Sequence, residues 1–199
     1  MSNFILTKKT ARLILLQRIQ LSGPLQKKIR KLFGRYLFTN FISKFFINTK
    51  TISKKYYELM VNEFDTIKEY LNKNNQSYLS IGGGLGGLEL IINKNFKDKN
   101  YYFIEKNYVS KKIRYGWDLK NDEGYNNLKL LNSFLLKNGM SSSKVNIFNF
   151  DTDKLPTNKF DIVVSLFSLD YHYDFNFYIN YLKQNSHSNT KIIFDTIRA

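Results

Sequence analysis

Residues 78–90, which read Tyr-Leu-Ser-Ile-Gly-Gly-Gly-Leu-Gly-Gly-Leu-Glu-Leu, combine the residue types that bind an anionic or nucleoside ligand. An apolar strand runs into five glycines, and an apolar helix follows them directly. Glycine adopts a left-handed backbone at little cost, and its missing Cβ lets a ligand lie against the main chain. The helix N-terminus presents unpaired N–H groups and the positive end of its dipole. The segment therefore predicts a nucleoside cofactor site, with a plain turn as the alternative.

The spacing of the glycines leaves the kind of cofactor open. Gly82, Gly84 and Gly86 fit the pattern G-x-G-x-G. Gly82, Gly84 and Gly87 fit equally well the pattern G-x-G-x-x-G of dinucleotide-binding folds. Both kinds of site place an acid at the end of the second strand, where it binds ribose hydroxyls. Glu105 ends an apolar run about twenty residues beyond the glycines, so it is the predicted ribose ligand.

Two later segments are predicted as strands: residues 145–150 alternate apolar and polar and end in Asp151-Thr152, and residues 160–165 read Phe-Asp-Ile-Val-Val-Ser. This pair resembles class I S-adenosylmethionine-dependent methyltransferases. In that family an acid after strand three contacts the adenine, and strand four ends beside the methyl donor. The resemblance covers residues 78–197 and implies S-adenosylmethionine as cofactor. It places Asp151 and Thr152 at the adenine and Ser165 at the end of strand four.

The same resemblance implies an α/β, Rossmann-like fold with parallel strands in the order 3-2-1-4-5. We expect a basic helical extension over residues 1–50 and the methyltransferase domain over residues 51–199. Ser80 stands where the family often has an acid, which removes a charge from the cofactor site. The family normally adds a two-stranded hairpin after strand five, predicted here at 191–195. We therefore expect a fold truncated after strand five, whose exposed edge a second copy of the chain is able to cover.

A helix is predicted over residues 51–72, before the first strand. Apolar residues recur there at alternating steps of three and four, so they lie on one face and predict packing against the core. These residues are Tyr57, Met60, Phe64, Ile67 and Leu71.

Composition excludes several kinds of function. The chain has no cysteine, which rules out disulfides, thiolate metal sites and a cysteine nucleophile. With two histidines, His172 and His187, a zinc site built by the protein is not expected. Residues 165–168 read Ser-Leu-Phe-Ser, in place of the Asn/Asp-Pro-Pro-Tyr/Phe of amino-methylating nucleic-acid enzymes. No apolar run reaches the roughly 18 residues of a spanning helix.

Positive charge is concentrated near the N-terminus. Residues 1–57 hold 13 lysines and arginines and no acid, out of a net charge of +15. A basic amphipathic helix is predicted over residues 24–36, with Leu25, Ile29, Leu32, Phe33 and Tyr36 on one arc. Gly34 within it is expected to weaken the helix by roughly 1 kcal/mol. Four interpretations stay open: packing on the core, an anionic membrane surface, RNA phosphates, or an organelle transit peptide.

Two segments are expected to reach the ligand crevice beyond the carboxyl ends of the strands. The long polar link at 106–123 contains Arg114 and Trp117, and the segment after strand four contains Tyr171 and Tyr173. These four residues are the predicted substrate-binding side chains.

The segment after strand four also holds the predicted catalytic residues. His172 is the candidate base for O-methylation, because its reference pKa near 6.5 suits proton transfer at neutral pH. Asp170 or Asp174 is the candidate carboxylate that orients it, and a surface histidine is the alternative interpretation. The Ser-Leu-x-Ser…Tyr-His-Tyr stretch is similar to bacterial methyltransferases assigned to sugar or polysaccharide modification.

That similarity implies O-methylation of a sugar or other small metabolite, in the cytoplasm or at the inner face of the membrane. One alternative is an RNA methyltransferase that uses its basic N-terminal region. A second is a binding protein that keeps the fold without turnover, and a third is a nicotinamide-dependent enzyme.

Overall fold

A single parallel sheet forms the centre of the chain. The computed structural model describes residues 3–34, 41, 47–110, 124–169 and 175–195. The strands lie in the order β3-β2-β1-β4-β5, which confirms the predicted order. Their bounds are β1 Ser77–Ile81, β2 Asn100–Glu105, β3 Val145–Asn149, β4 Phe160–Ser165 and β5 Ser186–Phe194. β5 begins earlier than predicted, because Ser186 pairs with Phe160 before a register shift leads into the expected pairing.

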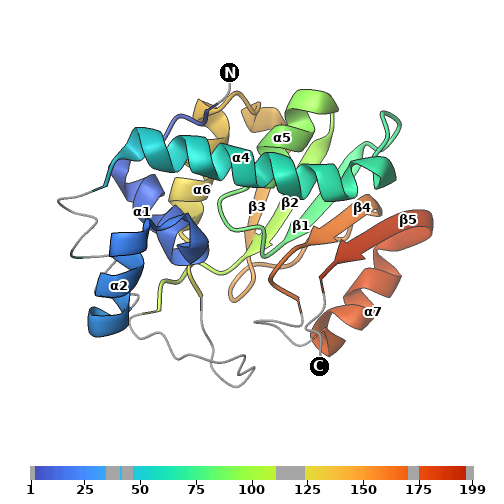
Figure 1. Cartoon of the computed structure of the whole chain (residues 1–199). Helices are drawn as coiled ribbons and strands as arrows, with labels where there is room; N and C mark the ends of the chain where they lie inside the picture. The colour runs from blue at the N-terminus through green and yellow to red at the C-terminus, as the bar shows by residue number, and fades with distance from the viewer. Residues whose placement is uncertain (1–2, 35–40, 42–46, 111–123, 170–174, 196–199) are drawn as a thin grey trace.

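The helices cover the two faces of the sheet unequally (Figure 1). Side chains alternate along a strand, so Tyr78 and Leu79 belong to opposite faces. Tyr78 joins the core formed with α1, α4, α5 and α6, whereas Leu79 joins a smaller cluster with α7. The helix bounds are α1 Lys8–Gln17, α2 Pro24–Phe33, α4 Thr49–Ile67, α5 Gly87–Asn95, α6 Leu128–Lys137 and α7 Asn176–Gln184. Short 3₁₀ turns lie at Ile19–Leu21, Lys68–Tyr70 and Ser142–Lys144.

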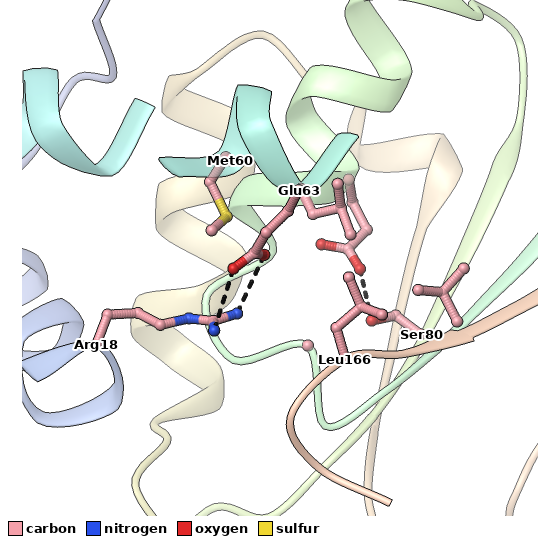
Figure 2. Close-up of a pocket in the computed structure, with 9 residues that line it drawn as sticks. Arg18, Met60, Glu63, Ser80 and Leu166 are labelled. Carbon is pink, nitrogen blue, oxygen red and sulfur yellow. Dashed lines mark hydrogen bonds and ion pairs between the residues drawn. The ribbon is translucent and has the colours of Figure 1, made fainter. Parts of the chain in front are cut away.

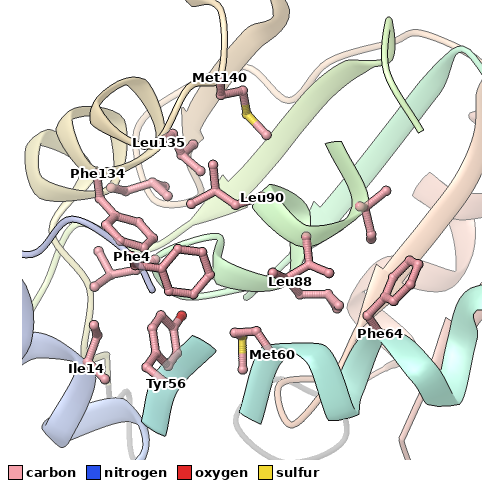
Figure 3. Close-up of a cluster of buried hydrophobic side chains, with 14 of the residues drawn as sticks. Phe4, Ile14, Tyr56, Met60, Phe64, Leu88, Leu90, Phe134, Leu135 and Met140 are labelled. Atoms are coloured by element: carbon pink, nitrogen blue, oxygen red, sulfur yellow. The ribbon is translucent and has the colours of Figure 1, made fainter. Parts of the chain in front are cut away.

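The larger core includes residues from the start of the chain (Figure 3). The ring of Phe4 lies 5.5 Å from that of Tyr56 and 5.4 Å from that of Phe134, centroid to centroid. Ile14 of α1 is fully buried in the same cluster. Residues before position 50 therefore share the core of the sheet, although the division into two regions at that position stays a prediction.

The buried face of α4 is shifted slightly from the predicted one. Met60, Phe64 and Ile67 are buried as expected. Tyr57, in contrast, is half-buried, and Tyr56 is 2% exposed in its place. The reason is that α4 turns Tyr56 toward the glycine loop, where a Cβ on Gly87 would lie 2.6 Å from its hydroxyl.

α2 ends earlier than the sequence predicts. Its last residue is Phe33, and Gly34 has φ +75°, the left-handed conformation of a residue that follows a helix. Gly34 therefore ends the helix rather than weakening its interior. Leu32 is 80% exposed and Phe33 is 61% exposed, so core packing is the wrong interpretation for these two residues. Within the described residues, no helix has the length and apolar character needed to cross a membrane.

Candidate cofactor site at the carboxyl ends of the strands

The glycine-rich loop joins β1 to α5 in a backbone conformation that other residues rarely adopt. Gly82 and Gly84 have φ values of +67° and +70°. A Cβ on Gly82 would lie 1.8 Å from Ser168 Oγ, and one on Gly84 would lie 2.8 Å from Gln17 Oε1. The close approach of the chain's own side chains therefore accounts for part of the glycine pattern, as the plain-turn interpretation expects.

Glu105 lies at the end of β2 and contacts this loop directly. Its Oε1 accepts a hydrogen bond of 2.6 Å from the Gly84 N–H. The side chain is buried, and burial raises the pKa of Glu105 to about 8, although hydrogen bonds from Asn126 and Gly84 lower it. A carboxyl with that pKa is largely protonated at pH 7. The structure thus brings the predicted ribose ligand to the predicted loop, with its charge suppressed by burial.

Two residues that the sequence did not point to complete this contact. The Asn126 side-chain amide donates to the Gly84 carbonyl at 2.7 Å. The Gln17 amide donates to the Tyr125 carbonyl, also at 2.7 Å. The end of α1, the glycine loop and the segment before α6 are therefore connected through side-chain amides. No spacing or pattern in the sequence could have identified Gln17 or Asn126, because both act through contacts between distant segments.

Asp151, the residue that the resemblance assigns to the adenine, follows a backbone contact with the end of β2. The N–H of Phe150 donates to the Glu105 carbonyl at 2.8 Å, which places Asp151 one residue beyond that contact. Lys106 Nζ lies 3.6 Å from Asp151 Oδ1, and the Asp151 side chain is 46% exposed while that of Lys106 is 7% exposed. Thr152 Oγ1 donates to Asp153 Oδ1 at 3.0 Å in the same exposed turn. An exposed carboxylate thus flanks the buried Glu105.

The two predicted serines are buried and make internal hydrogen bonds. Ser165 Oγ donates to the Ile81 carbonyl at 2.8 Å and accepts from the Leu169 N–H at 3.1 Å. Ser80 Oγ donates to Glu89 Oε1 at 2.6 Å. Ser165 therefore connects the carboxyl ends of β1 and β4, and Ser80 holds a carboxyl group from α5.

A small cavity beside Ser80 holds a cluster of charged groups (Figure 2). Arg18 and Glu63 form a two-pronged ion pair across it, with N–O distances of 3.1 and 3.2 Å. Glu89 also lines the cavity, and its Oε2 is buried with no hydrogen-bond partner among the described residues. Burial raises the pKa of Glu89 to about 7, although the Ser80 hydroxyl lowers it. A buried acceptor without a partner is a place where a ligand donor can bind.

Sequence reasoning did not single out this cluster, because its members come from three separate stretches of the chain. Arg18 directly follows α1, Glu63 lies in α4 and Glu89 lies in α5. The available signal was an acid, Glu89, inside the apolar run that begins α5.

The predicted catalytic and substrate-binding residues lie outside the described residues. They are Asp170, His172, Arg114, Trp117, Tyr171 and Tyr173. The structure describes the residues on either side of the segment that carries Arg114 and Trp117. The Ser110 N–H donates to the Gly124 carbonyl at 2.8 Å, and Val109 pairs with Tyr125 in an isolated antiparallel β-bridge. The described residues on either side of this segment, Ser110 and Gly124, therefore lie next to each other. No cluster of His, Asp and Glu suited to a metal ion occurs within the described residues.

Solved methyltransferases share this fold. The StiE O-MT structure aligns over 94% of this chain at 11% identity, with a TM-score of 0.51. Coclaurine N-methyltransferase bound to N-methylheliamine and SAH aligns over 95% at 12% identity, also with a TM-score of 0.51. The chain spans 58% of the length of each of these structures. No protein-family model and no functionally curated protein matches the sequence. The chain has the methyltransferase fold.

Proposed function

We propose that the protein is an S-adenosylmethionine-dependent methyltransferase that acts on an oxygen of a sugar or another small metabolite. The observation that carries this proposal is the contact between Glu105 and the Gly84 N–H. It puts a carboxyl group against the glycine-rich loop at the carboxyl edge of the sheet, where ligands of such folds bind. The shared fold with methyltransferases supports the same conclusion at the level of architecture.

The described residues offer a binding group for each polar part of the cofactor. Glu105 would accept hydrogen bonds from the ribose hydroxyls, and Asp151 with Thr152 would contact the adenine. The family often has an acid at the position of Ser80. Glu89 of α5 is hydrogen-bonded to Ser80, so its carboxylate would take the place of that acid. Its buried Oε2 is available for a cationic donor. When bound, S-adenosylmethionine supplies a methyl group attached to a positively charged sulfur.

The choice of acceptor rests on the sequence after β4. His172 would take the proton from the acceptor hydroxyl, and Asp170 would orient the imidazole. Arg114, Trp117, Tyr171 and Tyr173 would contact the acceptor. A base is not required for every methyl transfer, because positioning alone lowers the barrier substantially. The role of His172 therefore needs its own test.

Calorimetric titration of the full chain with S-adenosylhomocysteine, and separately with NAD, tests the cofactor. We expect micromolar binding of S-adenosylhomocysteine and none of NAD. Glu105→Ala should abolish the binding, whereas Glu58→Ala, which changes a glutamate that is 57% exposed on α4, should leave it unchanged. NAD binding would point to the nicotinamide-dependent alternative, and binding of neither compound would refute the enzyme proposal.

Turnover is tested by release of S-adenosylhomocysteine with nucleotide sugars, small phenols and RNA as acceptors. Transfer to a sugar hydroxyl that is lost in His172→Asn, with cofactor affinity unchanged, would support the proposed base. Transfer to RNA would replace the small-molecule acceptor with a nucleic acid. Cofactor binding without transfer to any of these acceptors would favour the non-catalytic binding protein.

A further inference from the structure

We propose that α2 is a membrane-docking helix that binds the surface of an anionic bilayer. Large apolar side chains at its C-terminal end are open to solvent: Leu32 is 80% exposed and Phe33 is 61% exposed. Ile29, one turn earlier, is half-buried. Successive helical residues lie 100° apart, so these three residues share one side of α2. At Leu32 and Phe33, this side of α2 is open to solvent and does not pack on the core.

Exposed lysines lie beside and opposite this apolar side. Lys27, Lys28 and Lys31 are all exposed, and helical geometry places them on the flank and far side of α2. The surrounding sequence adds only positive charge, with 13 basic residues and no acid in residues 1–57. A helix of this kind lies in the plane of the interface, with its apolar side among the acyl chains and its lysines at anionic headgroups.

The position of α2 suits such a role. Figure 1 shows α2 at the periphery of the molecule, away from the sheet. The chain reaches it directly from the candidate site, because α2 begins shortly after Gln17 and Arg18, which contact the glycine loop and Glu63.

The exposed apolar side chains favour a membrane over RNA as the partner. Lysines alone account for phosphate binding to nucleic acid, and aliphatic side chains such as Leu32 add nothing to it. Insertion into a bilayer uses both kinds of side chain, since apolar burial and headgroup attraction add together. The two partners thus predict different results for variants of the apolar side.

Vesicle co-sedimentation of the full chain tests the proposal. The probe is phosphatidylcholine vesicles, with and without about a third phosphatidylglycerol. We expect binding to the anionic vesicles only. The double variant Leu32→Ser/Phe33→Ser should weaken it roughly tenfold or more, because the inserted apolar area is lost. The triple variant Lys27→Gln/Lys28→Gln/Lys31→Gln should weaken it roughly a hundredfold, at about fivefold per lysine.

Phe177→Ser is the matched control, since Phe177 lies on α7 and is 78% exposed. It should bind vesicles like the unchanged protein, and all variants should keep the same thermal unfolding midpoint. The proposal is overturned if the chain binds no anionic vesicles or if Phe177→Ser weakens binding as much as the α2 double variant. RNA binding that persists in the double variant, without vesicle binding, would assign α2 to nucleic acid. Self-association lost in that variant would assign it to a second copy of the chain.

Discussion

The protonation of Glu105 should make binding of the ribose part of the cofactor depend on pH. Burial raises the pKa of this carboxyl to about 8, so it is about 3% ionised at pH 6.5 and about 90% ionised at pH 9. Two ribose hydroxyls donate hydrogen bonds, and an ionised carboxylate accepts both more strongly than a protonated carboxyl does. Affinity should therefore rise about 30-fold between these pH values, which is about 2 kcal/mol.

Adenosine is the best ligand for this measurement, because it carries the ribose hydroxyls and no group that titrates between pH 6.5 and 9. It also lacks the amino-acid part of S-adenosylhomocysteine, which has its own titrating amine. Calorimetry in buffers of different ionisation enthalpy should show release of about one proton per adenosine at pH 6.5. Glu105→Gln keeps an acceptor for the Gly84 N–H while it removes the charge.

We expect Glu105→Gln to bind adenosine with the same affinity at every pH. The loss relative to the unchanged protein should be largest at pH 9, at about 1.5–3 kcal/mol for each hydrogen bond to a charged group. Glu58→Gln should retain the full pH dependence. An affinity that varies less than about twofold across this range would refute the reasoning. So would a Glu105→Gln variant whose affinity rises with pH as steeply as that of the unchanged protein.

Three further predictions concern stability. Burial raises the pKa of Glu63, Glu89 and Glu105 in the folded protein above the value near 4.3 of an unfolded chain. The folded protein should therefore be most stable below about pH 4.3 with respect to these groups and lose that stability as the pH rises toward 8. Urea unfolding at pH 5, 6.5 and 8 should show this decline, and Glu105→Gln should make the decline smaller. Phe4→Ala should lower the free energy of unfolding by about 3–5 kcal/mol, because Phe4 is buried in the core. Ile5→Ala should lower it by less than about 0.5 kcal/mol, because Ile5 is 54% exposed. Equal losses for the two variants in a denaturant titration would show that Phe4 is not part of the core. Gly34→Ala should lower the free energy of unfolding by about 1–2 kcal/mol, because Gly34 has a positive φ. Gly84→Ala should lower it by more, because Gly84 also has a positive φ and its new Cβ would meet the Gln17 side chain. Equal losses for the two variants would contradict that contact.

The positions of the main elements could be predicted because they follow from local patterns, whereas the strand order was implied by the resemblance to class I methyltransferases. The apolar runs mark the strands, and the glycine cluster marks the β1–α5 turn. Glu105 ends β2, and Asp151 lies two residues beyond the end of the neighbouring strand β3. Parallel strands bring their carboxyl ends to one edge, so spacing predicted that Glu105 lies near the loop, whereas the role of Asp151 was implied by the family resemblance.

The contacts made by side chains could not be predicted in the same way. Gln17 reaches Tyr125 across more than a hundred residues, and no periodicity encodes that distance. The Arg18–Glu63 pair and the Ser80–Glu89 hydrogen bond meet only because α1, α4 and α5 pack on the same face of the sheet. The exposure of Leu32 and Phe33 could not be predicted either. An amphipathic sequence pattern is the same whether its apolar side packs on a core or is open to solvent.

The basic N-terminal region has two physically different parts, and this changes how its function must be tested. Phe4 and Ile14 are buried in the main core, and the Gln17 side chain lies against Gly84. α2 presents exposed lysines beside Leu32 and Phe33 instead. Deleting residues 1–50 would therefore remove core packing and a wall of the candidate site together with any docking surface.

Loss of RNA or membrane binding in that truncation would carry no information about charge, because the same change would follow from unfolding. Substitutions confined to the exposed residues of α2 avoid this ambiguity, since they leave Phe4 and Ile14 in place. A variant of α2 that loses vesicle binding while it keeps S-adenosylhomocysteine affinity would separate docking from the cofactor site. A variant that loses both would instead show that α2 and the glycine loop are energetically coupled through α1.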